Sequence, residues 1–228
     1  MTDCLQAVED EIVACERCPR LVDWRTAVAR EKRKAFRGEE YWGKPVPGFG
    51  DPSARVLVVG LAPGAHGSNR TGRMFTGDAS GEFLYRHLYR AGFANQPTST
   101  GRSDGLALKG IFISAVGRCV PPDNRPTPAE ISACLPFLRR EIACLQALRG
   151  IVVLGKIAYD GVAALLRERE ILLPKNDFGH GRLFQPEGSP YWILQSYHPS
   201  RQNTQTGRLT EAMFAAIWDE VNRLLSTD

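Results

Sequence analysis

The strongest constraint on the fold is a set of four short, continuous runs of branched apolar residues. The runs are ARVLVVG (54–60), IFISA (111–115), IVVLG (151–155) and YWILQ (191–195). Runs of this length and composition are typical of strands that are buried on both faces, as strands are in parallel sheets. Helical stretches separate the runs, so the chain is expected to form an α/β fold whose parallel sheet is covered on both sides. The expected helices lie at 82–90, 128–148, 156–167 and 209–225, and two more occupy the first 35 residues.

The size and composition of the chain suit one globular unit. Its 228 residues fit a single domain, 1–228, with a helical N-terminal segment of about residues 1–36. No apolar run approaches the roughly 20 residues that a membrane span requires, and the acidic start lacks the pattern of a signal peptide. We therefore expect a cytoplasmic monomer with reduced thiols and no membrane partner. The net charge of +4 permits a polyanionic partner without requiring one.

The loops that follow the strands are the expected site, because ligands of parallel sheets bind beyond the carboxyl ends of the strands. Residues 60–81 contain six glycines, which let backbone N–H groups approach an acceptor closely. Phe75 offers a ring for a planar base, and Arg70 and Arg73 suit phosphates. The alternative is a flexible phosphate loop, but the P-loop ending and the dinucleotide fingerprint are both missing. The composition favours a base- or nucleotide-binding loop.

The loop after the fourth strand begins with His198-Pro199-Ser200. A neutral imidazole donates a hydrogen bond to an oxygen that becomes negative as a bond breaks, which is the functional interpretation of His198. Arg201 and Asn203 suit contacts with a DNA backbone or the gap left by an extruded base. The alternatives are a structural histidine and simple turn formation by Ser200 and Asn203.

The cysteines suggest a metal site. Cys15 and Cys18 form a tight pair in a helix-breaking turn, and Cys119 and Cys134 flank one long loop. Four thiolates hold either tetrahedral zinc or an iron–sulfur cubane, and one tight pair with two dispersed cysteines is unlike a zinc ribbon. The remaining two, Cys4 and Cys144, are expected to pack as small hydrophobic residues.

Three segments together resemble the iron–sulfur uracil-DNA glycosylases, specifically family 5 or type B. They are GLAPGAHGSNRTGRMFTGD (60–78), GRCVPPDNRPTPAEISAC (117–134) and YHPSRQNTQTGRLT (197–210), in the order of that family's motifs. The resemblance runs from Cys15 to the C-terminal helix. It implies a three-layer α/β/α fold around a mainly parallel sheet of four to five strands. It also implies a structural [4Fe-4S] cluster on Cys15, Cys18, Cys119 and Cys134.

The departures from related families are informative. Family 4 has a glutamate where this chain has Leu61, and other branches orient water with an aspartate or asparagine where this chain has Ala62 and Pro63. Family 4 also reads the pyrimidine edge with an asparagine at the position of Ala115. The resemblance therefore implies family 5, with weaker side-chain discrimination and activity on other deaminated bases such as hypoxanthine.

The resemblance implies a monofunctional DNA glycosylase of base excision repair that acts on single- or double-stranded DNA. The base must leave the stack before its glycosidic bond can be reached. His198 is expected to stabilise the departing anion, and Asp78 to favour the sugar cation and position or deprotonate water. The alternative role of Asp78 is the N-cap of a helix that begins at Ala79. The residues expected to bind the base are Ala62, Pro63, Gly64, Ala65, Phe75, Asn124 and His198, and those expected to contact DNA are Arg70, Arg73, Ser200, Arg201 and Asn203.

The expected products are a free base and an intact abasic site, because lysines for a Schiff base are scarce in the candidate loops. The rival from another class is a non-catalytic nucleic-acid-binding module with a structural metal site. Its main binding face would consist of Arg20, Arg25, Arg30, Lys32, Arg33 and Lys34.

Overall fold

The computed structural model describes residues 2–174 and 177–227, and its centre is a six-stranded sheet. The order of the strands is β1-β3-β2-β4-β6-β5. The four inner strands are parallel to one another and fully buried, which confirms the prediction made from the apolar runs. These strands are β2 (Val56–Gly60), β3 (Ile111–Ala115), β4 (Gly150–Leu154) and β6 (Trp192–Ser196).

The two edge strands bring the sheet to six strands, instead of the four to five expected. β1 (Phe49–Gly50) pairs antiparallel with β3, and β5 (Leu183–Phe184) pairs antiparallel with β6. Each contains two residues, which is too short for any hydrophobic period to appear in the sequence. Short edges of this kind also limit unwanted pairing with other chains.

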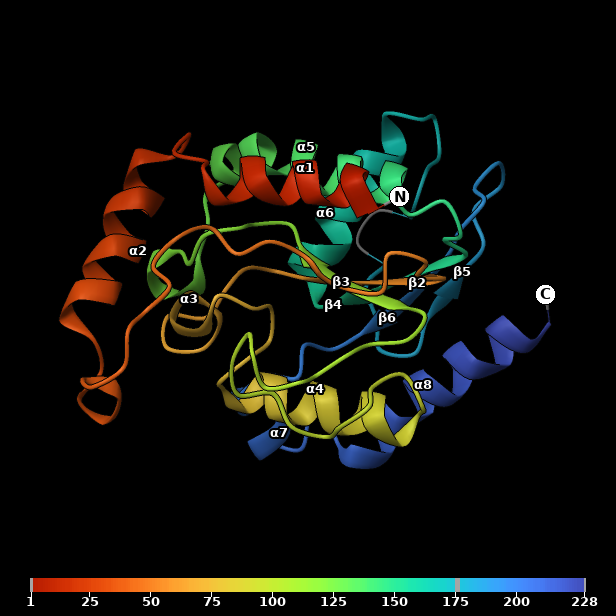
Figure 1. Cartoon of the computed structure of the whole chain (residues 1–228). Coiled ribbons are helices and arrows are strands. Elements are labelled where there is room, and N and C mark those ends of the chain that lie inside the picture. Colours follow the sequence, from red (N-terminus) through yellow and green to blue (C-terminus); the bar gives the residue numbers. More distant parts are fainter. Residues whose placement is uncertain (1, 175–176, 228) are drawn as a thin grey trace.

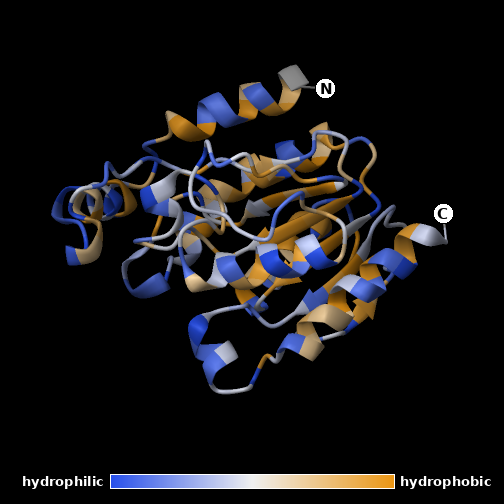
Figure 2. Ribbon diagram, turned by 60° about the horizontal axis from the view of Figure 1, so that its bottom comes forward, coloured by the Kyte–Doolittle hydropathy of each residue, from blue (hydrophilic) through white to orange (hydrophobic). Residues whose placement is uncertain are grey.

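Helices cover both faces of the sheet, so the three-layer α/β/α architecture is confirmed (Figure 1). α1 (Thr2–Val13), α5 (Pro128–Cys144) and α6 (Lys156–Arg167) lie on one side, and α4 (Ala79–Arg90) and α8 (Glu211–Ser226) on the other. Each face has its own apolar core. Figure 2 shows the inner strands as hydrophobic and α1 and α8 with alternating hydrophobic and hydrophilic residues, as helices with one buried face require. None of the described helices is long and apolar enough to cross a membrane.

The cysteines of the α1–α5 layer correct one expectation. Cys4 and Cys144 form a disulfide, with 5.8 Å between their Cα atoms, and are not separate small hydrophobic residues with reduced thiols. The physical reason is the lengthwise packing of α1 on α5, which brings the start of the chain beside the end of α5. The two cysteines are 140 residues apart in the sequence, and this spacing does not predict that they pair.

The parallel inner strands place their carboxyl ends, and the loops that follow, at one edge of the sheet. Backbone hydrogen bonds tie these loops together: the Gly117 N–H donates to the Leu61 carbonyl at 2.8 Å, and the Gly155 N–H donates to the Ser196 carbonyl at 2.8 Å. The helix α2 (Pro19–Glu31) and the short helix α3 (Ser68–Thr71) lie at this end of the molecule (Figure 1). This edge therefore positions the candidate site.

Candidate active site

A ring contact joins the loops after β2 and β6. The rings of Phe75 and His198 stack with 5.7 Å between their centroids and 29° between their planes. Phe75 has a left-handed backbone (φ +52°), and its ring lies so close to Gly60 that a Cβ there would stand 2.7 Å from it. A conformation this costly for a bulky residue persists only when its surroundings hold it in place. The structure thus brings the predicted stacking ring and the predicted imidazole into direct contact.

Asp78 follows Phe75 by three residues and ends the same loop. It is the N-cap of α4, and its Oδ1 accepts a hydrogen bond from the Gly81 N–H at 3.0 Å, so the alternative role as a cap is confirmed. The second oxygen, Oδ2, lies against Gly64 and Gly67, where an added Cβ would stand only 2.9 Å and 2.1 Å from it. Burial raises the pKa of Asp78, although the Gly81 N–H opposes the shift. One oxygen therefore caps the helix while the other faces the glycine loop.

The first part of the loop presents backbone donors. Within the described part of the chain, the N–H groups of Ala62, Gly64 and Ala65 reach no protein acceptor, and Pro63 has no N–H. All three donors belong to partly exposed residues. The Gly64 carbonyl accepts from the Asn69 N–H at 3.0 Å and so turns the chain into α3. The loop can therefore offer N–H groups to the carbonyl oxygens of a base.

His198 lies at the rim of a cavity beyond the carboxyl ends of the inner strands. Burial lowers its pKa to about 4, so the imidazole is neutral near pH 7. A neutral ring that is free of internal hydrogen bonds among the described residues can donate to a ligand. The residues that line the cavity include Leu61, Leu154, Gly155, Tyr197, His198 and Arg208.

In the segment after His198, Ser200 and Asn203 hold the backbone in place, whereas Arg201 is exposed. The Ser200 Oγ caps α7 (Arg201–Gln205) by accepting from the Asn203 N–H at 3.3 Å. The Asn203 side chain donates to the His198 carbonyl at 2.9 Å and fixes the backbone of the histidine. The turn-forming roles of Ser200 and Asn203 are thereby confirmed. Arg201 is exposed, and its contact with DNA stays a prediction.

The two arginines of the loop correct an expectation. Arg73 is only 4% exposed, and its guanidinium pairs with Asp104 at 2.5 Å and donates to Ser99 at 2.8 Å. Arg70 pairs with Glu39 and donates to the His66 carbonyl at 2.7 Å and to the Gly77 carbonyl at 3.0 Å. Both side chains are occupied in holding the loop together, so neither is available for the phosphate contacts that were predicted.

Asn124 ends the short 3₁₀ helix η2 (Pro122–Asn124) and is exposed. Its backbone is left-handed (φ +55°), as is that of Asp123 (φ +53°), a conformation that asparagine and aspartate tolerate better than most residues. The left-handed backbone therefore explains an asparagine at position 124 without any role in binding. Contact of Asn124 with the base stays a prediction.

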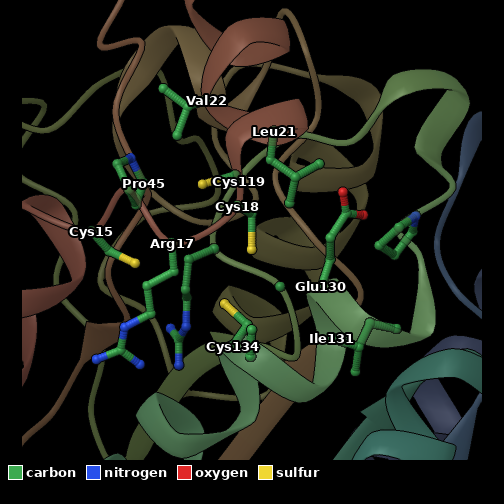
Figure 3. Close-up of a pocket in the computed structure, with 14 residues that line it drawn as sticks. Cys15, Arg17, Cys18, Leu21, Val22, Pro45, Cys119, Glu130, Ile131 and Cys134 are labelled. Atoms are coloured by element: carbon green, nitrogen blue, oxygen red, sulfur yellow. The ribbon is translucent and has the colours of Figure 1, made fainter.

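The four cysteines that the resemblance assigns to a cluster line one cavity (Figure 3). Cys15 and Cys18 come from the turn before α2, Cys119 from the loop after β3, and Cys134 from α5. All four are free thiols, and burial raises the pKa of Cys134 to about 12. Among the described residues, no three Cys, His, Asp or Glu side chains converge as ligands of one metal ion.

Two buried arginines indicate what kind of group suits this cavity. Arg25 is 5% exposed and has no carboxylate partner among the described residues; its Nη1 donates to the Cys119 Sγ at 3.4 Å and to the Cys15 carbonyl at 3.3 Å. Arg118 is 1% exposed and forms a buried ion pair with Glu141 at 2.5 Å, but its Nε and Nη1 have no partner in the described chain. A buried cation without a counter-charge, as at Arg25, and buried N–H groups without acceptors, as at Arg118, are both costly. Soft sulfur donors beside them therefore fit an anionic iron–sulfur cluster.

Two candidate site residues, Tyr197 and Arg208, were not predicted from the sequence. Arg208 lines the cavity beside His198, with its guanidinium 4.9 Å from the ring centroid of Tyr197. Both lie within the third motif, 197–210, so the motif was a usable signal even though these side chains were not singled out.

The comparisons with known proteins agree with this geometry. The sequence profile of the uracil DNA glycosylase superfamily matches residues 47–222. A type-5 uracil-DNA glycosylase of Thermus thermophilus is 51% identical over 96% of this chain and 97% of its own length. The type-5 enzyme of Mycobacterium tuberculosis is 49% identical over 93% of this chain and 79% of its own. A type-4 uracil-DNA glycosylase of Pyrobaculum aerophilum is 31% identical over 86% and 83%. This chain therefore belongs to the uracil-DNA glycosylase superfamily and, within it, to the type-5 branch.

Proposed function

We propose that this chain removes uracil from DNA by hydrolysing the N-glycosidic bond, which makes it a monofunctional glycosylase. The observation that carries the proposal is the ring contact of Phe75 with His198, in a loop that ends three residues later at the buried carboxylate of Asp78. A stacking ring, a neutral imidazole and a carboxylate are the three groups that the reaction needs: one for the base, one for the departing anion and one for the sugar cation or the water.

In the proposed reaction, the nucleotide first leaves the DNA stack so that its base can enter the pocket. The base stacks on Phe75, and the free N–H groups at 62–65 donate to its carbonyl oxygens. As the glycosidic bond stretches, His198 donates a hydrogen bond to the base oxygen that becomes negative. The low pKa of His198 keeps the ring neutral near pH 7, and a neutral ring still carries one N–H for this hydrogen bond.

Asp78 completes the reaction through its Oδ2. The carboxylate stabilises the sugar cation and orients or deprotonates the attacking water, while Oδ1 stays on the Gly81 N–H. The raised pKa supports the role of base, because a more basic carboxylate accepts a proton from water more readily. Its position against Gly64 and Gly67 places the charge beside the donors that read the base.

Cys15, Cys18, Cys119 and Cys134 would hold a [4Fe-4S] cluster, which supplies a structural cross-link between α2, the loop after β3 and α5. A cubane offers four separate corners, which suits thiols arranged around a cavity. Arg25 would supply a balancing positive charge, and the unpartnered Nε and Nη1 of Arg118, whose own charge is balanced by Glu141, would supply hydrogen bonds.

The pocket also supports a wider choice of bases. The side chains of Leu61, Ala62 and Pro63 have no polar group that could hydrogen-bond to the edge of a pyrimidine. Recognition of the base therefore depends on the backbone N–H groups. Hypoxanthine offers a carbonyl oxygen to the same donors and is the second substrate proposed. Asn124 is proposed to contact the base, and Ser200, Arg201 and Asn203 to contact DNA near the extruded nucleotide. A cytoplasmic monomer is the form in which we expect the enzyme to act.

The test is release of free base from DNA by the purified holoprotein without any added cofactor. Oligonucleotides that carry uracil, hypoxanthine, xanthine or mismatched thymine are compared side by side, and the products are resolved before and after alkaline cleavage. The proposal expects uracil release that leaves an intact abasic site. Binding of uracil-containing DNA without base release would favour the non-catalytic module instead.

A further inference from the structure

The segment 30–37, called the basic arm below, carries charge that the catalytic loop lacks. It comprises the end of α2 and the short 3₁₀ helix η1 (Lys34–Phe36), and Glu31 is its one acidic residue. It stands at the same end of the molecule as α3 (Figure 1). Four of its five cations are exposed and Lys32 is partly buried. The cations are Arg30, Lys32, Arg33, Lys34 and Arg37.

The basic arm is fastened directly to the catalytic loop. The guanidinium of Arg70 lies 3.9 Å from the ring centroid of Phe36, and Arg70 also pairs with Glu39, just beyond the arm. The same guanidinium donates to the carbonyl of Gly77, the neighbour of Asp78, at 3.0 Å. One side chain thus connects the arm, the loop and the start of α4. The position of the arm relative to the catalytic carboxylate is therefore fixed.

A second connection runs through an aromatic residue. The Tyr41 hydroxyl lies 3.1 Å from Nδ1 of His66 in the catalytic loop, and the Arg33 N–H donates to the same hydroxyl at 3.4 Å. Burial lowers the pKa of His66, and the positive charges of Arg33 and Arg70 lower it further. The backbone of the arm is therefore joined to the catalytic loop at Arg33 as well.

The charge balance of the loop 60–78 favours a phosphate contact from the arm. The loop 60–78 has two strong cations, Arg70 and Arg73, and both are engaged internally. DNA presents one negative charge per ~1.7 Å of helix axis, and proteins hold it chiefly through lysine and arginine contacts with phosphates. Of the six cations in the alternative binding face, Arg25 is buried and Arg20 pairs with Glu130 at 2.7 Å, which leaves those of the arm.

We propose that the basic arm binds the phosphates of the DNA that flanks the extruded nucleotide. Lys34 and Arg37 are its principal contacts, because both are exposed and neither has an acidic partner among the described residues. This inference rests on the proposed function for the identity of the nucleic acid. The arm holds the duplex beside the loop, and the loop itself handles the base.

The experiment compares Lys34→Gln/Arg37→Gln with Arg167→Gln/Arg169→Gln in the full-length holoprotein. The control removes the same charge from the C-terminal end of α6, which follows β4 and so runs back to the opposite edge of the sheet. Affinity for a duplex of about 20 base pairs that carries an abasic-site analogue is measured at several salt concentrations.

The expected result is a several-fold weaker affinity of the arm variant for the duplex at low salt. The slope of log affinity against log salt falls by about 2, because each lost phosphate contact removes roughly 0.9 from it. The control variant keeps the affinity and the slope of the wild type. An unchanged slope in the arm variant, or an equal change in the control, would overturn the proposal. Failure of the proposed function shows separately, as DNA binding without release of uracil.

Discussion

The imidazole of His198 stacks on the ring of Phe75, with 5.7 Å between the two centroids. The two residues follow different strands, β6 and β2, and meet because parallel strands end at one edge of the sheet. Gly60 admits the Phe75 ring, and Asn203 holds the backbone of His198. The proposed aromatic surface for the base and the proposed donor to the departing base are thus held together by packing before any ligand binds.

Gly67→Ala should impair catalysis more than folding. A Cβ at Gly67 would lie 2.1 Å from Oδ2 of Asp78, so the carboxylate must move. A displacement of this kind costs on the order of 100-fold in the rate of a positioned reaction. The measurement is single-turnover release of uracil, together with the midpoint of thermal unfolding. The matched control is Gly101→Ala, where the added Cβ meets nothing within 4 Å; an equal rate in the two variants would remove Asp78 Oδ2 from the reaction.

The pH dependence of uracil release should follow Asp78 and not His198. Burial raises the pKa of Asp78, so the active carboxylate is lost, as the pH falls, at a higher pH than the ordinary value of 3.8. Burial lowers the pKa of His198 to about 4, so its ring stays neutral well below the ordinary value of 6.5. Single-turnover rates measured from pH 4 to pH 9 should show no step near 6.5 in the wild type. A step there that disappears in His198→Ala would contradict this assignment.

The sequence predicted the inner sheet well because each inner strand is buried on both faces and therefore shows as a continuous apolar run. It also offered the cap at Asp78 as the alternative to a catalytic role, since capping depends on residues within one helical turn. The roles of Arg70 and Arg73 could not be predicted, because their partners Glu39 and Asp104 lie in other loops. The same holds for the Cys4–Cys144 disulfide, which depends on the packing of α1 against α5.

Cys4→Ser should destabilise the fold by about 2–4 kcal/mol, because the disulfide closes a long loop and restricts the unfolded chain. The measurement is the free energy of unfolding in urea, with and without a thiol reductant. The reductant should weaken the wild type to the level of Cys4→Ser and leave the variant unchanged. Counting the reactive thiols of the denatured, unreduced wild type checks the premise. Four reactive thiols are expected when Cys4 and Cys144 are paired, and six would show that the disulfide does not form.

Arg25→Gln should alter the proposed cluster through charge. The guanidinium of Arg25 donates to the Cys119 Sγ and has no carboxylate partner among the described residues, so its loss removes a positive charge beside the sulfur ligands. We expect a more negative midpoint potential and faster loss of the cluster absorbance in air. Arg30→Gln, on the exposed part of the same helix, is the control and should match the wild type. A wild-type potential in Arg25→Gln would refute the role of counter-charge.

The most direct test of the account is the single-turnover rate of uracil release by Asp78→Asn, measured beside its affinity for DNA that carries an abasic-site analogue. Asparagine keeps the shape of the side chain and an oxygen for the Gly81 N–H, but it carries no negative charge and does not act as a base. The account predicts a rate at least 100-fold below that of the wild type, with DNA affinity within a few-fold. A rate close to that of the wild type, or equal losses in rate and affinity, would contradict the role of Asp78 in the chemistry.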